Sequence, residues 1–234
     1  MVPRVDPLFD KPVPQTAEDV LAFWFGRAPE SEADVKACMK RWYGGGPELD
    51  AEIDARFGPL MAAAANSELT DWATSPRGRL GLIVLLDQFP RSVYRSTAGA
   101  FAQDSLALDL TMTGMAARFD SRLDPLERLF FYMPLQHSES LEVQQQSVAA
   151  FEALAAAHAE LFLRKALLGS ADYARQHRDI IAQFGRFPHR NSVLGRRSTP
   201  EEARYLEQGG ATFGQSAAAT PSNDSVQAGD DLDA

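Results

Sequence analysis

Arginine, histidine and asparagine side chains are concentrated in one polar connection near the end of the chain. Residues 184–202 read FGRFPHRNSVLGRRSTPEE and contain Arg186, His189, Arg190 and Asn191. Arginine recognises carboxylate and phosphate groups through two parallel hydrogen bonds, and histidine exchanges protons near neutral pH. The segment therefore predicts an anion-binding site, with His189 as a candidate for proton transfer. Alternatively, the arginines only cap helix carbonyls and pair with Asp87 and Glu139.

A second polar cluster, His137-Ser138-Glu139, follows Pro134 in a helical stretch. We expect Pro134 to break that helix, so that the cluster lies near the N-terminus of the next one. In a projection of this next helix, Glu139 falls one turn before Val143 on the inward stripe. An inward Glu139 beside His137 predicts an acid–base pair or half of a metal site. The alternative is that Ser138 is an N-cap and Glu139 only favours the helix dipole.

Two further candidates, Asp87 and His177, fall on apolar faces. Asp87 lies near the end of residues 79–89, RLGLIVLLDQF, where a carboxylate needs a cationic partner. Arg91 is the nearest cation in the sequence, and an arginine of the C-terminal polar connection could also reach it. A buried structural ion pair is the alternative to a functional carboxylate. His177 leads directly into the same connection, where it is either a ligand-binding residue or a hydrogen-bonded core histidine.

The sequence gives only weak support for a metal site and does not identify a cofactor. Cys38 is the single cysteine, so one chain can form neither a disulfide nor a cysteine-based metal site, and a reducing compartment is expected. The motifs H-x-x-H and H-E-x-x-H are absent, as are a phosphate-binding glycine loop and a G-x-S-x-G elbow.

The composition indicates a globular protein rather than a nucleic-acid-binding or membrane protein. The chain has 234 residues, of which 45% are hydrophobic, and a formal net charge of −9. An acidic protein with a pI of about 5.0 is poorly suited to a polyanionic partner. The longest apolar run is Leu82–Leu86, far shorter than a membrane span, and the first residues lack the apolar core of a signal peptide. A cytoplasmic location is therefore expected.

Helix start and stop signals recur along the chain, and no pair of strand candidates is present. Thr199 opens the last helix through a capping box with Glu202, and Gly185 ends the helix before it. Residues 79–89 are interpreted as a buried helix that ends at Pro90, because no second strand could pair with them. Further helices are expected at residues 97–119, 138–168 and 170–184.

These helices predict one all-α domain, residues 16–214, built from antiparallel helix pairs. Residues 1–15 are rich in proline and are expected to form an extended arm. Residues 215–234 are acidic and have few apolar side chains, so we expect a disordered tail.

Three motifs together resemble a bacterial family known as domain of unknown function 924. They are LLDQFPRSVYRSTAGAFAQD at residues 85–104, FYMPLQHSE at 131–139 and the polar connection at 184–202. The resemblance extends over roughly residues 16–214. It implies an all-α fold similar to tetratricopeptide-repeat (TPR) proteins, with helix pairs stacked in a right-handed superhelix. It implies no reaction and no catalytic residues.

Two hypotheses about function follow. In the first, the motifs converge on a pocket for a small anionic ligand, in which Arg91, Arg186 and Arg190 hold the anion. His137 or His189, together with Glu139, moves a proton. In the second, the protein is a TPR-like scaffold that binds a peptide or another protein, and the polar motifs are structural.

Overall fold

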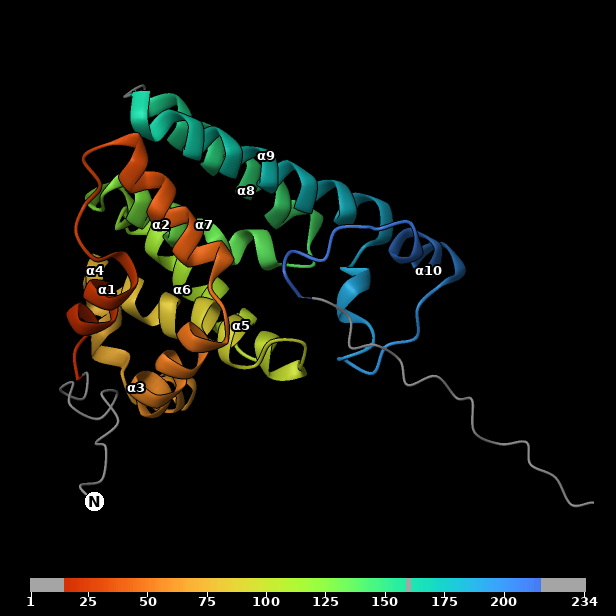
Figure 1. Cartoon of the computed structure of the whole chain (residues 1–234), viewed down its shortest axis with the longest axis horizontal. Helices are drawn as coiled ribbons and strands as arrows, with labels where there is room; N and C mark the ends of the chain where they lie inside the picture. The colour runs from red at the N-terminus through yellow and green to blue at the C-terminus, as the bar shows by residue number, and fades with distance from the viewer. Residues whose placement is uncertain (1–14, 159–160, 216–234) are drawn as a thin grey trace, which may run out of the picture.

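Residues 15–158 and 161–215 are described by the computed structural model, and all their regular structure is helical (Figure 1). The capping signals act as expected at several helix starts, because the Thr16, Ser31 and Thr199 side chains each accept a hydrogen bond from a first-turn N–H. In chain order the elements are α1 (Ala17–Phe25), α2 (Glu32–Gly44), α3 (Pro47–Ala65), η2 (Thr70–Thr74), α4 (Pro76–Ile83), the π-helical turn η3 (Val84–Gln88), α5 (Phe89–Val93), η4 (Ala98–Phe101), α6 (Asp104–Ala116), η5 (Asp120–Arg122), α7 (Pro125–His137), α8 (Leu141–Ala157), α9 (Leu161–Phe184), η6 (Pro188–Arg190) and α10 (Pro200–Glu207).

Helix α7 lies at the centre of the hydrophobic core. It contacts α4, α6, α8 and α9, and Phe130, Phe131 and Leu135 are fully buried. The rings of Trp24 and Trp42 pack edge-on against Phe130, with centroids 5.7 and 4.6 Å away. Such aromatic pairs add to the apolar area that the core removes from water.

The expected buried helix at residues 79–89 is confirmed, but it does not end at Pro90. The chain passes from α4 through η3 into α5 without leaving helical geometry. In η3 the N–H of Phe89 bonds to the carbonyl of Val84, five residues earlier, and the next residue, Pro90, has no N–H to place. A wide π turn thus accommodates the missing donor, so the helix continues.

Pro134 also fails to break its helix. It lies inside α7, which continues to His137. A proline in a helix interior costs about 3 kcal/mol. Here the surrounding apolar side chains of α7, including Leu135, are buried, and this tertiary packing outweighs the local penalty.

Three other helix boundaries differ from expectation. Thr97 caps only the short turn η4, and α6 begins separately at Asp104. The stretch 138–168 is divided, since α8 ends at Ala157 and α9 then packs against it. Ser170 lies within α9, where its hydroxyl donates to the carbonyl of Ala166 instead of starting a helix.

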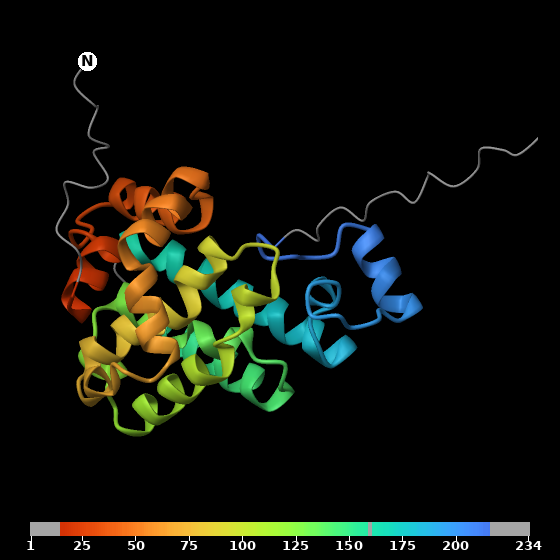
Figure 2. The same cartoon turned by 90° about the horizontal axis from the view of Figure 1, so that it is seen from below.

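The C-terminal part has a small core of its own. Ile180, Ile181 and Phe187 pack with Tyr205 and Phe213, separate from the main cluster. Helix α10 lies at the end of the molecule opposite α1 in both views (Figure 2). After α10 the chain turns back, so the 211–215 segment lies over the main helices near α5.

The proposed arm and tail fall almost entirely at residues 1–14 and 216–234, which lie outside the described residues. Gln215, the first residue of the expected tail, is buried and hydrogen-bonded to the body. Across the described ranges no helix combines the length and apolar character that crossing a bilayer requires.

Candidate functional site

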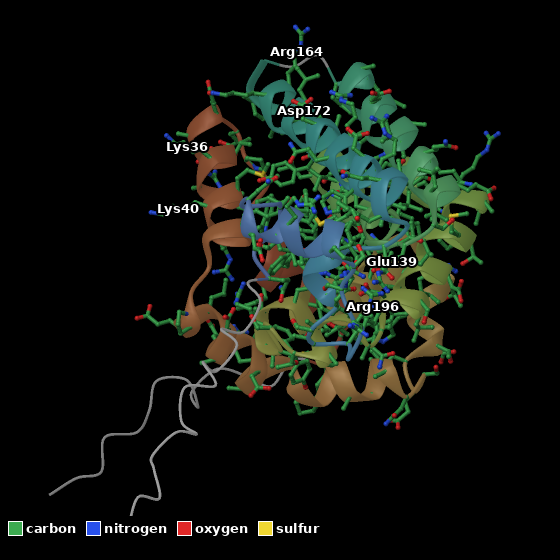
Figure 3. All side chains as sticks on the ribbon, turned by 90° about the vertical axis from the view of Figure 1, so that its right-hand side faces the viewer. Lys36, Lys40, Glu139, Arg164, Asp172 and Arg196 are labelled. Atoms are coloured by element: carbon green, nitrogen blue, oxygen red, sulfur yellow. The ribbon has the colours of Figure 1, made fainter. Side chains whose placement is uncertain are left out.

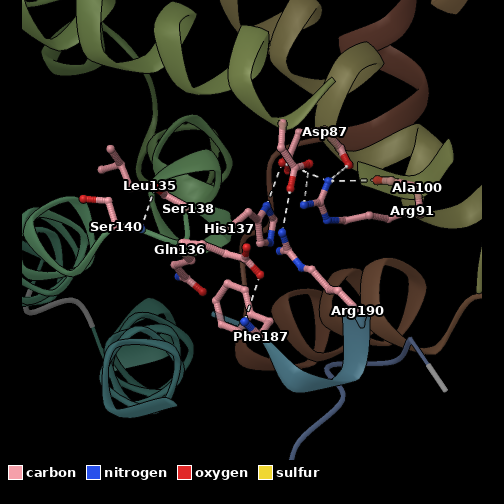
Figure 4. Close-up of polar contacts among 12 residues, drawn as sticks. Asp87, Arg91, Ala100, Leu135, Gln136, His137, Ser138, Ser140, Phe187 and Arg190 are labelled. Carbon is pink, nitrogen blue, oxygen red and sulfur yellow. Dashed lines mark hydrogen bonds and ion pairs between the residues drawn. The ribbon is translucent and has the colours of Figure 1, made fainter. Parts of the chain in front are cut away.

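Asp87 is the buried centre of a polar cluster between η3, α5 and α7 (Figure 4). Its side chain is fully buried. One carboxylate oxygen, Oδ1, lies 2.6 Å from Nδ1 of His137 and 3.1 Å from Nη1 of Arg91. The other oxygen accepts from the side-chain amide of Gln88. The carboxylate thus has both a cation and a histidine as partners.

The helices explain why Asp87, Arg91 and His137 lie close together. Asp87 and Arg91 are four residues apart on the continuous η3–α5 helix, so their side chains lie on the same face. His137 is the last residue of α7. Because α7 continues past Pro134 without a break, His137 lies next to Asp87. The sequence predicted the Asp87–Arg91 pair, but it predicted Glu139 rather than Asp87 as the carboxylate beside His137.

The electrostatics of the cluster favour an ionised Asp87 beside a neutral His137. Burial alone would raise the pKa of Asp87, but Arg91 and His137 lower it to about 2. Burial and the Arg91 charge lower the pKa of His137, against the opposing effect of Asp87. At neutral pH the Nδ1–H of His137 therefore donates to Asp87. Nε2 then carries a lone pair, and no described residue forms a hydrogen bond with it.

Asp104 extends the cluster and was missed by sequence reasoning. Its Oδ1 lies 2.8 Å from Nη2 of Arg91, and its Oδ2 lies 3.1 Å from Nη1 of Arg190. Arg190 is stacked between the rings of Phe101 and Phe187, each 4.5 Å away. Asp104 is the last residue of the first motif. Because Arg91 and Arg190 each need a carboxylate partner, this acidic residue could have been proposed as that partner from the sequence.

Glu139 does not bond to His137. Its carboxylate binds both Nη atoms of Arg196, at 2.6 and 3.0 Å, and accepts from the backbone N–H of Phe187 at 2.8 Å. Figure 3 shows Glu139 and Arg196 side by side at this end of the molecule. Burial would raise the pKa of Glu139, but these donors lower it, so the group is an ionised tether for the C-terminal connection. The expected N-cap is also displaced, since Ser140 rather than Ser138 caps α8.

Arg186 and Asn191 bind Glu202 rather than Asp87. Arg186 makes two contacts with the Glu202 carboxylate, at 2.6 and 2.8 Å, and Asn191 donates to it at 3.1 Å. The bonds to Arg186 dominate in lowering the pKa of Glu202 to about 2. These contacts hold the connection against α10, away from Asp87.

His177 and His189 are both buried, but only His177 lines the pocket described next. Nδ1 of His177 bonds to the carbonyl of Tyr173 at 2.8 Å, and its ring stacks on Phe213 with centroids 3.6 Å apart. Nδ1 of His189 is buried without a hydrogen-bond partner among the described residues. Burial lowers the pKa of each histidine to about 3, so both are neutral.

His137 opens onto a pocket of about 540 Å³, within the range of small-molecule sites. The polar residues that line it include Gln88, Arg91, Arg95, Gln136, His137 and His177. The apolar residues that line it include Trp24, Met39, Trp42, Leu49 and Met133. Among the described residues that line it, the charged ones are both arginines.

One wall of the pocket is a strap formed by residues 211–215. Gln215 secures it, since its side chain donates to the carbonyl of Arg91 at 3.0 Å and accepts from the N–H of Ser96 at 3.1 Å. Phe213 contributes the ring that covers His177. No group of three or more potential metal ligands gathers anywhere in the described ranges.

Comparison with known proteins identifies relatives but no activity. No curated protein matches the sequence. A solved structure of a protein of unknown function from Agrobacterium tumefaciens is 35% identical, with a TM-score of 0.68 over 82% of this chain and 97% of that one. The sequence model of the family described as "Bacterial protein of unknown function (DUF924)" matches residues 20–210. Because that match spans most of the sequence, the chain belongs to the bacterial DUF924 family.

Proposed function

We propose that the protein is an enzyme that performs acid–base chemistry on a small organic anion, with His137 as general base. The observation that carries the proposal is the arrangement of His137. A buried, ionised Asp87 holds Nδ1, while Nε2 has no partner among the described residues and the ring lines a 540 Å³ pocket. A carboxylate that fixes the histidine tautomer and stabilises the imidazolium is a recurrent feature of catalytic histidines.

The sign of the charge at the pocket supports an anionic ligand. Arg91 and Arg95 line it, whereas the carboxylates that pair with them, Asp87, Asp104 and Asp50, are not among its lining residues. A ligand therefore meets guanidinium groups and neutral histidine rings. Arg190 supports the site indirectly through Asp104.

The geometry suits removal of a proton from water or from the ligand itself. A neutral His137 accepts that proton at Nε2, and the charge of the resulting imidazolium is balanced by Asp87. A positioned general base contributes about 10²–10⁴-fold to a rate. This role leaves Glu139 and His189 outside the proton transfer, because neither is among the lining residues.

Hydrolysis of p-nitrophenyl acetate tests the proposal without knowledge of the natural substrate. Water adds to the ester carbonyl carbon, its proton passes to Nε2 of His137, and p-nitrophenolate leaves. We expect His137→Gln to lose most of the protein-dependent rate. His158→Gln is the matched control, because His158 is only partly buried and lies outside the pocket lining. Equal rates in the parent and His137→Gln, with equal urea midpoints, would remove His137 as the base.

A second candidate function is peptide binding by a TPR-like right-handed superhelix. It is favoured by two exposed aromatic side chains that line the pocket, Tyr43 and Tyr173, which are 59% and 56% exposed. Exposed aromatic residues are enriched in protein interfaces. This function predicts that a partner protein binds the parent and His137→Gln equally and is lost when both tyrosines are replaced by alanine.

A further inference from the structure

The charges around the pocket are almost fully compensated, which limits the charge of its ligand. Arg91 is shared between Asp87 and Asp104, and Asp104 also binds Arg190. Arg95 pairs with Asp50 through Nη2, at 3.0 and 3.2 Å. These three carboxylates thus face three guanidinium groups. A phosphate dianion would add two negative charges to a neutral set, whereas a single carboxylate adds one.

The remaining hydrogen-bonding capacity also points to one small anionic group. Nη1 of Arg91 already donates to the carbonyl of Asp87 at 2.7 Å, and Nη2 is bound to Asp104. Nη1 of Arg95, by contrast, has only a 3.5 Å contact with the carbonyl of Gly214. The Arg95 side chain is 41% exposed, so this donor is accessible to a ligand. Nη1 of Arg95 therefore offers a ligand an accessible and weakly occupied donor.

The apolar residues that line the pocket favour a ligand with an apolar body. Met133 and His137 are one turn apart on α7, which separates them by about 6 Å along the helix axis. Trp24 and Trp42 line the same pocket as Met133. A ligand that reaches Nε2 of His137 therefore shares the pocket with aromatic and thioether side chains, which favour flat rings.

We propose that the ligand of this pocket is a singly charged carboxylate attached to a flat, apolar ring system. Its carboxylate binds Arg95, its ring lies along Trp24, Trp42 and Met133, and the atom that reacts lies at His137. This inference rests on the proposed function, because it assigns the substrate class of the same site.

Three commercial probes distinguish this ligand class from its alternatives: 2-naphthoate, the uncharged 2-naphthamide and inorganic phosphate. Calorimetric titration measures affinity, and the NMR signals of the His137 ring report whether a probe occupies the pocket. We expect 2-naphthoate to bind and to shift the His137 signals. We expect 2-naphthamide to bind at least tenfold more weakly and phosphate to bind least.

The variant Arg95→Gln tests the carboxylate contact. It should weaken 2-naphthoate about tenfold and leave 2-naphthamide unchanged. Arg175→Gln is the matched control, because Arg175 is also a partly exposed, carboxylate-paired arginine but lies outside the pocket. Absence of 2-naphthoate binding, equal affinity for the amide, tighter binding of phosphate, or an unchanged affinity in Arg95→Gln each overturns the ligand class.

These experiments distinguish a failure of the ligand class from a failure of the proposed catalytic role of His137. If ester hydrolysis depends on His137 while 2-naphthoate does not bind, the ligand class is wrong and the catalytic assignment stands. If 2-naphthoate binds at Arg95 while hydrolysis does not depend on His137, the pocket is a binding site without the proposed base.

Discussion

Replacing Asp87 by asparagine should destabilise the protein by about 2–3 kcal/mol. The pKa of Asp87 is about 2 in the folded chain, compared with an ordinary value of 3.8. At about 1.4 kcal/mol per pH unit, this difference corresponds to about 2 kcal/mol. Removing one partner of a buried ion pair costs about 3–5 kcal/mol. Arg91 keeps Asp104 and two backbone carbonyls, so the loss should fall at the lower end.

The sign of the effect follows from the lowered pKa. The ionised carboxylate stabilises the folded chain above pH 3.8, and this contribution is lost as the pH falls toward 2. Urea unfolding at pH 7, followed by circular dichroism, measures the change, which corresponds to a decrease in Tm of about 5–10 °C. The control Asp172→Asn removes a 62% exposed carboxylate and should change stability by less than about 0.5 kcal/mol. An Asp87→Asn variant as stable as the parent would show that Asp87 does not stabilise the fold as a buried counter-ion.

Three further predictions concern the histidines, the strap and the C-terminal connection. His177 and His189, whose pKa values are lowered to about 3, are neutral when folded but gain protons below about pH 6.5 when unfolded. Between pH 7.5 and 5.5 the free energy of unfolding should therefore fall by about 1.4 kcal/mol for each, and pH-independent urea midpoints would contradict their burial. Gln215→Ala removes both hydrogen bonds of the strap, so it should lower stability by about 1–3 kcal/mol and speed hydrogen exchange at residues 211–215. Unchanged exchange there would show that Gln215 does not hold the strap. Glu202→Gln should lower the urea midpoint at pH 7, because it leaves Arg186 without its carboxylate partner, and an unchanged midpoint would make that pair irrelevant to stability.

Capping residues and hydrophobic patterns correctly predicted those helix features that depend only on neighbouring residues. The capping box at Thr199, the glycine end at Gly185 and the buried helix at residues 79–89 are all present. Pro90 and Pro134 were misread because burial and a π turn offset penalties that a local rule treats as decisive. In such cases tertiary packing, which a single sequence does not display, decides the outcome.

Only part of the candidate site could be predicted from the sequence. Asp87 and Arg91 are one helical turn apart, so their pairing follows from spacing. His137 is fifty residues from Asp87, and sequence alone could not join them. Glu139 was assigned to His137 because the helix was projected from the wrong residue, whereas α8 starts only after Ser140. Gln215 carries no local signal at all, since its partners lie more than one hundred residues away.

The tautomer of His137 decides whether it can act as a base, because only an unprotonated Nε2 accepts a proton from a ligand. Long-range proton–nitrogen NMR correlations distinguish a protonated ring nitrogen from one that carries a lone pair. We expect that, at pH 7, Nδ1 of His137 is protonated, Nε2 is not, and the ring gains its second proton only below pH 6.5. A His137 that is protonated at Nε2, or doubly protonated at pH 7, would contradict its role as a general base oriented by Asp87.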